Sequence, residues 1–135
     1  MNDKKINVLV VDDDEDILMM MGDFLEIVEN AHLFSVLSSK DITQATEFIE
    51  SHKPEILITD ITLPGGDGAM LAEKLRQSNK NSYIVIMSGW NQDTSSGKRV
   101  QNVDSYLKKP FDFDKFESII KEAVIRINKD STVQC

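Results

Sequence analysis

The stretch "VLVVDDDEDI", residues 8–17, places four apolar residues directly before five consecutive acidic residues. An uninterrupted apolar run of this kind is typical of a parallel β-strand that is covered on both faces. Because charges are costly beside a hydrophobic core, the acids from Asp12 to Asp16 need a physical reason to follow the strand at once. The ends of the other predicted strands supply that reason.

Short apolar runs recur along the chain and alternate with helical patterns. The further predicted strands are 33–37, 56–59, 84–87 and 105–107. Helical stripes, in which apolar residues repeat every three or four positions, begin at Ile17, Ile42, Met70 and Phe116. We expect these stripes, including the run from Met19 to Met21, to pack in the core. Asp14 is placed to cap the first helix, and Pro54 to end the second.

Strand and helix alternate five times, which predicts an α/β fold with a five-stranded parallel sheet, doubly wound by helices on both faces. The fourth helix should lie within residues 89–102, where Trp90 and Val100 are the large apolar residues, so we expect it to be short or loosely attached. One domain over residues 5–128 and a short C-terminal tail over 129–135 are predicted.

Composition narrows the classes of function. The chain has 135 residues, is 41% hydrophobic and 28% charged, and carries a formal net charge of −8. That charge argues against direct nucleic-acid binding, which needs clustered Lys and Arg. A single cysteine, Cys135, excludes an internal disulfide and a thiolate zinc site. No run resembles a signal peptide or a membrane span, so a cytoplasmic protein is expected.

Reactive side chains follow four of the predicted strands. In an open parallel sheet the active crevice lies outside the carboxyl ends of the strands. The residues at these ends are Asp12 and Asp13, Asp60, Ser88, and Lys109. Three carboxylates, a hydroxyl and an ammonium group therefore converge on one edge of the sheet.

Electrostatics indicates what such a site requires. Two carboxylates roughly 5 Å apart repel by about 3 kcal/mol at an effective dielectric constant near 20. A cation must offset this repulsion, and an all-oxygen ligand set favours a hard divalent ion such as Mg²⁺. A carboxylate beside that ion is a competent nucleophile toward phosphorus. The ammonium and hydroxyl groups complete the arrangement that a transferred phosphoryl group needs.

The quoted pieces "VLVVDDDEDI", "LITDITLPGGDG", "IVIMSG" and "YLKKPF" occur in this order and at suitable spacing. Together they resemble the receiver domain of two-component response regulators, over roughly residues 5–128. The resemblance implies a flavodoxin-like sheet with strand order 2-1-3-4-5. It also implies Mg²⁺-dependent phosphorylation that switches a protein-interaction face.

The resemblance assigns a role to each matching residue. Asp60 would be the phosphoacceptor, and Asp12 and Asp13 would bind Mg²⁺ with Asp13 as the more direct ligand. The metal would also be bound by Asp60 and by the backbone carbonyl of Thr62. Ser88 would be the switch hydroxyl, and Lys109, rather than Lys108, would pair with the phosphoryl group. The remaining matches are Tyr106 as the switch aromatic, the turn residues Pro64, Gly65 and Gly68, and Pro110 at a position where a cis peptide is usual.

The resemblance further implies the protein's partners. A histidine kinase or a histidine phosphotransfer protein would donate the phosphoryl group, and a downstream protein would respond. No direct contact with nucleic acid or membrane is expected, and a homodimer is possible. Such a protein is not an enzyme in the usual sense, because it catalyses only its own phosphorylation and dephosphorylation. Two arrangements stay open: a stand-alone receiver similar to a chemotaxis regulator, which we favour, and a receiver that is part of a longer protein.

Two other functions compete with this interpretation. A phosphohydrolase of the haloacid dehalogenase type would use Asp12 as nucleophile with Asp14 two residues later, but leaves "TDITLPGGDG" unexplained. A receiver-like binding module that is never phosphorylated is the second. An EF-hand is excluded, since Ile17 stands where the loop needs glycine. Within the receiver interpretation, Trp90 either shields Asp60 from water, giving a long-lived phosphoryl group, or packs on the surface.

Overall fold

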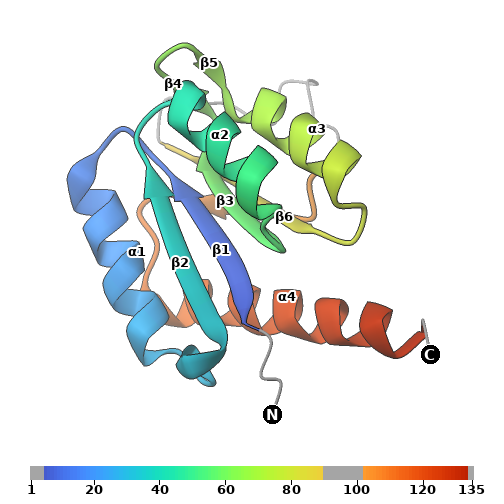
Figure 1. Ribbon diagram of the computed structural model, residues 1–135. Coiled ribbons are helices and arrows are strands. Elements are labelled where there is room, and N and C mark those ends of the chain that lie inside the picture. Colours follow the sequence, from blue (N-terminus) through green and yellow to red (C-terminus); the bar gives the residue numbers. More distant parts are fainter. Residues whose placement is uncertain (1–4, 90–101, 134–135) are drawn as a thin grey trace.

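The computed structural model describes residues 5–89 and 102–133, and its core is a parallel sheet between two layers of helices (Figure 1). The strands of the main sheet are β1 (Ile6–Val11), β2 (Phe34–Ser39), β3 (Ile56–Asp60), β6 (Tyr83–Ser88) and β7 (Ser105–Lys108). The helices are α1 (Glu15–Ile27), α2 (Ile42–His52), α3 (Gly68–Ser78) and α4 (Phe113–Val133), with a 3₁₀ turn η1 (Ala31–Leu33). A small hairpin consists of β4 (Thr62–Leu63) and β5 (Gly66–Asp67).

The strand order is β2-β1-β3-β6-β7, with parallel pairing throughout. Since β6 and β7 are the fourth and fifth strands of this sheet in chain order, the predicted order 2-1-3-4-5 is confirmed. The chain order reverses direction between β1 and β3, and the carboxyl ends of both strands lie there. A crevice at this switch point is where open α/β sheets bind ligands.

Alternate side chains of each central strand enter two separate cores. Val8 and Val10 pack with α1 and α4 on one face of the sheet, whereas Leu9 and Val11 pack with α2 and α3 on the other. Figure 1 shows the same division, with α1 and α4 on one side of the sheet and α2 and α3 on the other. Both faces are therefore covered, as the uninterrupted apolar runs predict.

Central and edge strands differ in burial. Every residue of β3 and β6 is buried, because these strands have neighbours on both sides and helices on both faces. Along the edge strands β2 and β7, exposed positions instead alternate with buried or partly buried ones. This alternation explains why the sequences of these two strands are less uniformly apolar than those of the central strands.

Four sequence-based expectations need comment. The prediction that the helical stripes pack in the core is wrong for Met19 and Met70, which are 67% and 52% exposed; each lies on the solvent side of its helix. The helix expected within 89–102 and the two hypotheses on Trp90 fall largely outside the described residues.

The segment predicted as a tail from residue 129 begins as helix, because α4 continues to Val133. Backbone hydrogen bonding propagates the helix past the last apolar residue that faces the core.

The hairpin β4–β5 was not anticipated from the sequence. Its turn contains Gly65, whose φ of +91° is a conformation that glycine adopts without strain. The hairpin leads from the end of β3 into α3 beside the sheet's switch point. Among the described residues, no helix combines the length and apolar character that crossing a membrane requires.

Candidate functional site

The strand ends place the predicted site residues side by side. Asp12 directly follows β1, Asp60 ends β3, Ser88 ends β6, and Lys109 directly follows β7. The register pairs Val11 with Thr59 and Asp60 with Met87, so the ends of the three central strands are level. Parallel pairing thereby brings residues that are far apart in the sequence close together at one edge of the sheet.

The three predicted metal-binding carboxylates form one group. Asp12, Asp13 and Asp60 each offer an oxygen, and these oxygens lie within 4.8 Å of one another. Asp12 is fully buried, Asp60 is 7% exposed and Asp13 is exposed. The cluster thus has two carboxylates in its floor and one at its rim, with access from solvent on the Asp13 side.

Asp60 has one oxygen without a protein partner. Its Oδ1 is buried and makes no hydrogen bond with any described residue. A buried carboxylate oxygen left unpaired is costly, because the lost hydration is not replaced. An arriving cation or phosphoryl group at this oxygen would remove that cost. Among the side chains of the cluster, this oxygen is the best candidate for direct contact with a ligand.

Lys109 bridges the two buried carboxylates. Its Nζ lies 2.6 Å from Asp12 Oδ2 and 3.2 Å from Asp60 Oδ2. Burial alone would lower the pKa of Lys109, but the hydrogen bond to Asp12 and the charges of Asp12 and Asp60 outweigh burial and raise it. Lys109 is therefore a positive charge held beside Asp60, the carboxylate to which the family resemblance gives the role of phosphoacceptor.

Asp12 behaves differently from an ordinary ion-paired carboxylate. Burial raises its pKa, and the charge of Asp60 raises it further; the hydrogen bonds from Lys109 and from the Asp14 backbone N–H lower it without cancelling the effect of burial. The Lys109 pair alone does not compensate for the removal of Asp12 from water. The site therefore retains a need for additional positive charge.

Backbone hydrogen bonds hold the first acids in place. The Asp12 N–H donates to the Ser39 carbonyl, at 3.1 Å, and the Asp14 N–H donates to Asp12 Oδ1, at 2.9 Å. Asp14 Oδ1 in turn accepts the N–H of Asp16, so Asp14 is the N-cap of α1 as predicted. Glu15 and Asp16 are exposed in the first helical turn, where the helix dipole favours negative charge.

Gly68 lets α3 begin against the backbone of Asp60. A Cβ atom at this position would lie 2.4 Å from the Asp60 carbonyl oxygen, which is far closer than real side chains approach. The Gly68 N–H also donates to the Ile61 carbonyl at 2.8 Å. Gly68, the last glycine of "PGGDG", thus allows α3 to begin in close contact with Asp60 at the end of β3.

The structure also places the remaining predicted residues. Ser88 is buried, and its carbonyl accepts the Lys109 N–H at 2.7 Å, which joins the β6 and β7 ends of the site. The Lys109–Pro110 peptide is cis, as expected. Thr62 is exposed in β4, two residues past Asp60. Tyr106 lies on β7 and is 40% exposed, so its ring points outward in this structure.

Sequence reasoning missed an ionic cluster at the opposite end of β7. Asp104 Oδ2 accepts hydrogen bonds from Arg76 Nη2 and from the Ile84 N–H, each at 2.8 Å, and Asp104 Oδ1 pairs with Arg126. These contacts connect β7 to α3, β6 and α4. The available signal was an acidic residue, Asp104, directly before the last predicted strand.

The phosphohydrolase alternative requires Asp12 to attack phosphorus. Asp12 is 0% exposed and both of its oxygens are engaged, one by Lys109 and one by the Asp14 N–H. Asp14, the second acid of that motif, caps α1 and is exposed. The geometry gives neither residue the position that this reaction needs.

Comparison with known proteins places this site in a family. The family model described as "Response regulator receiver domain" matches residues 8–121. Response regulator Rre1 of Synechocystis is 29% identical over 125 residues, which cover 90% of this chain and 52% of that protein. The chain spans about half the length of the first curated relatives that it matches.

Solved structures share the fold. The receiver domain of a Luxo repressor protein from Vibrio parahaemolyticus superposes with a TM-score of 0.82, at 18% identity, over 97% of this chain and 98% of that one. A CheY-like receiver domain protein from Methanospirillum hungatei gives a TM-score of 0.81, at 23% identity, over 94% and 99% of the two chains. With the family model covering most of the sequence, the chain belongs to the receiver domain family of two-component response regulators.

Proposed function

We propose that this receiver domain accepts a phosphoryl group on Asp60 in a reaction that requires Mg²⁺. The observation that carries the proposal is the unpartnered, buried Oδ1 of Asp60, which lies in a carboxylate whose other oxygen is 3.2 Å from Lys109 Nζ. A nucleophile with a free oxygen and a cation beside it suits attack on an anionic phosphorus centre.

The donor set fits a hard divalent cation. Asp12, Asp13 and Asp60 offer oxygens within 4.8 Å of one another, and Mg²⁺ is commonly bound through one or two carboxylates with water completing its shell. Because both oxygens of Asp12 are already engaged, Asp13 is the better candidate for direct contact, and the Thr62 carbonyl is a further candidate. When bound, the ion would neutralise charge on the transferred phosphoryl group.

In the proposed reaction, an Asp60 oxygen attacks phosphorus and forms an O–P bond. The P–N bond of a phosphohistidine, or the P–O bond of a small acyl phosphate, breaks, and the electron pair leaves with the imidazole or the carboxylate. Lys109 would offset the negative charge of the phosphoryl oxygens, and Ser88 would donate a hydrogen bond from its hydroxyl. The step as written needs no general base, because a carboxylate nucleophile loses no proton when it forms the O–P bond.

The switch would follow from the same contacts. Ser88 and Lys109 are linked by the hydrogen bond from the Lys109 N–H to the Ser88 carbonyl, so movement of either residue toward a phosphoryl group affects both strand ends. Tyr106, three residues before Lys109 and outward-facing here, would then turn inward. Phosphorylation would shift a pre-existing equilibrium at this face, and would not create a new fold.

The phosphodonor would be a histidine kinase or a histidine phosphotransfer protein in the cytoplasm, and the acceptor of the signal would be another protein. Beyond its own phosphorylation and dephosphorylation, no catalytic turnover is expected. A homodimer stays a prediction.

The test is labelling by acetyl phosphate, followed by intact mass. We expect the wild type to gain the mass of one phosphoryl group only when Mg²⁺ is present, and Asp60→Asn to gain none. Asp67→Asn is the matched control, because Asp67 caps α3 and is exposed, and asparagine retains the cap. Labelling of Asp60→Asn at the wild-type level would refute the assignment.

A further inference from the structure

Thr59, the residue before the proposed phosphoacceptor, is a buried polar residue to which nothing above gives a role. It is 0% exposed. The residues that precede it in β3 are all apolar, from Ile56 to Ile58. Valine would have nearly the same shape at this position and would remove the cost of burying a hydroxyl group. The hydroxyl at the end of this strand therefore needs an explanation.

The partner of this hydroxyl is the backbone of Asp60. Thr59 Oγ1 donates a hydrogen bond to the Asp60 carbonyl oxygen at 2.9 Å, and the bond is buried. The Thr59 methyl group lies on the side of Gly68, where an added Cβ would be 3.0 Å from Thr59 Cγ2. A β-branched side chain has few accessible rotamers, so packing of the methyl group helps to keep the hydroxyl directed at the carbonyl.

The peptide group between Asp60 and Ile61 is hydrogen-bonded at both of its polar atoms. Its carbonyl oxygen accepts from the Thr59 hydroxyl, and its N–H donates to the Met87 carbonyl at 3.0 Å. The next carbonyl, that of Ile61, accepts the Gly68 N–H at 2.8 Å. The direction of the backbone as it leaves Asp60 is therefore set by three hydrogen bonds, and Thr59 supplies the one that comes from a side chain.

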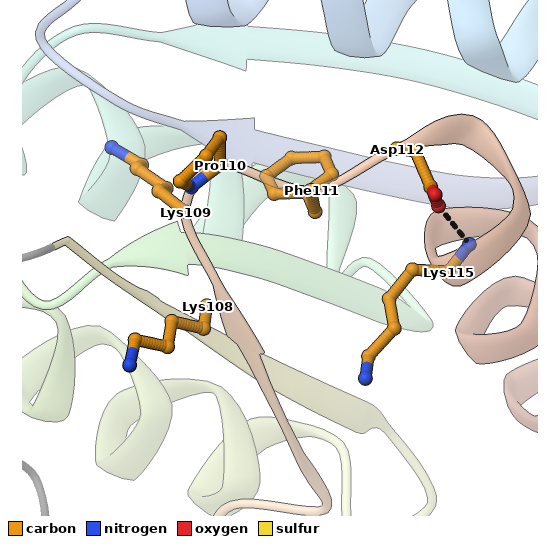
Figure 2. A pocket seen from close by; sticks show the side chains of 6 residues that line it. All are labelled: Lys108, Lys109, Pro110, Phe111, Asp112 and Lys115. Carbon is orange, nitrogen blue, oxygen red and sulfur yellow. Dashed lines mark hydrogen bonds between the residues drawn. The ribbon is translucent and has the colours of Figure 1, made fainter.

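The carboxylate of Asp60 is held separately from its backbone. Lys109 points away from Lys108 and Lys115 in Figure 2, and its Nζ lies 3.2 Å from Asp60 Oδ2. This ion pair restrains one carboxylate oxygen, whereas the other, Oδ1, has no hydrogen-bond partner among the described residues. The position of Oδ1 therefore also depends on the backbone from which the side chain projects.

We propose that Thr59 is a positioning residue for the phosphoacceptor site. Its hydrogen bond fixes the peptide group that follows Asp60, and thereby directs Asp60 Oδ1 and the Thr62 carbonyl toward the position of the metal and the phosphoryl group. A displacement of about 1 Å can slow a reaction by about a hundredfold, so such a restraint matters. Thr59 acts through Asp60 and touches neither the metal nor phosphorus. The inference rests on the proposed function.

The first test is Thr59→Val, which keeps the shape and removes the donor. A methyl group cannot stay 2.9 Å from a carbonyl oxygen, so the peptide group must move. The rate of labelling by acetyl phosphate at saturating Mg²⁺, followed by intact mass, should fall at least about tenfold. Mg²⁺ binding without phosphodonor, measured by calorimetry, should weaken at least about threefold, because two candidate ligands are displaced.

Thr59→Ser should restore both properties, because it keeps the donor. We expect labelling and Mg²⁺ affinity within about threefold of the wild type, although the variant loses a buried methyl group and unfolds at a lower urea concentration. A role in stability alone predicts the reverse, with labelling rates that follow the urea midpoints. The matched control is Ser82→Ala, which removes a buried hydroxyl directly before β6, at the opposite end of that strand from Ser88. It should leave labelling and Mg²⁺ binding unchanged.

Equal labelling and equal Mg²⁺ binding by Thr59→Val and the wild type would overturn the proposal, and so would failure of Thr59→Ser to restore them. If Thr59→Val does not fold, Thr59→Ser is compared with Thr59→Ala, which differs from it only in the hydroxyl; equal behaviour of these two would again count against Thr59. A wild type that is not labelled refutes the phosphoacceptor assignment instead. Mg²⁺ binding by the same variants then decides the positioning role.

Discussion

At the scale of single residues, Asp12 shows why the acids follow the first strand. Its carboxylate is fully buried, and Asp13 and Asp60 offer oxygens within 4.8 Å of it. Carboxylates at this spacing repel by about 3 kcal/mol per pair at an effective dielectric constant near 20. Lys109 pairs with Asp12 and Asp60, but burial still raises the pKa of Asp12. The strand end is therefore destabilised by its own acids until a cation binds.

Replacing Asp12 with Asn should stabilise the metal-free protein. A carboxyl whose pKa is raised by folding contributes stability that is fully present below its unfolded pKa and lost as the pH rises through its folded pKa. At neutral pH ionised Asp12 is thus unfavourable, and the neutral isostere removes the penalty. We expect a gain of about 1 kcal/mol, or roughly 3 to 6 °C in Tm, by thermal unfolding in EDTA.

The same experiment in Mg²⁺ should reverse the ranking. Wild type should gain stability with added Mg²⁺, by about 2.7 kcal/mol at about one hundred times Kd, whereas Asp12→Asn should gain much less. Asp14→Asn keeps the helix cap and should respond to Mg²⁺ like the wild type. A wild type that is indifferent to Mg²⁺ would contradict the assignment of the carboxylate cluster as a metal site.

Gly68→Ala tests the close approach of α3 to the acceptor residue. The new Cβ would meet the Asp60 carbonyl oxygen at 2.4 Å, so backbone must move, and we expect a loss of about 2 kcal/mol or more. Gly22→Ala in α1 is the control, since its Cβ would meet nothing within 4 Å and alanine favours helix by about 1 kcal/mol. Urea unfolding of both variants gives the comparison; similar effects would show that contact with Asp60 is unimportant.

At the scale of elements, β7 is an edge strand that is fastened at both ends. One end carries Lys109, which reaches Asp12 and Asp60. At the other end Asp104 pairs with Arg76 and Arg126, whose guanidinium also lies over the Tyr83 ring, 5.4 Å from its centroid. An edge strand with one neighbouring strand needs such anchors, because β6 alone hydrogen-bonds only one of its sides.

Asp104→Asn should weaken this anchor. Asn keeps the size of the side chain but removes the charge that two arginines share, and Asp104 is only 12% exposed. We expect a loss of about 2 to 3 kcal/mol in urea unfolding, less than for a fully buried pair. The exposed pair of Lys74 and Glu50 provides the control, because Glu50→Gln should cost about 0.5 kcal/mol or less. An equal cost for both variants would contradict the anchoring role of Asp104.

At the scale of the whole molecule, the sequence predicted the order of the strands better than the exposure and contacts of individual side chains. The central strands were predictable because uninterrupted apolar runs indicate burial on both faces, and β3 and β6 are buried throughout. The meeting of Asp12, Asp60 and Lys109 followed from parallel topology alone. Assignment of roles to these residues came from the family resemblance and stays a proposal.

What the sequence could not reveal depends on three-dimensional packing. Exposure of Met19 and Met70 is decided by helix rotation, which a local apolar pattern leaves open. The Asp104 cluster joins residues of α3, β6 and α4 to the residue before β7, and no local pattern marks such a contact.

The central claim is that Asp60 is the residue that carries the phosphoryl group. The most direct measurement is reduction with borohydride after treatment with acetyl phosphate and Mg²⁺, because an acyl phosphate is reduced to an alcohol and its aspartate becomes homoserine. Peptide mapping by mass spectrometry then identifies the position. The account predicts homoserine at position 60 and at no other acid; homoserine at Asp12 or Asp13, or none at all, would contradict it.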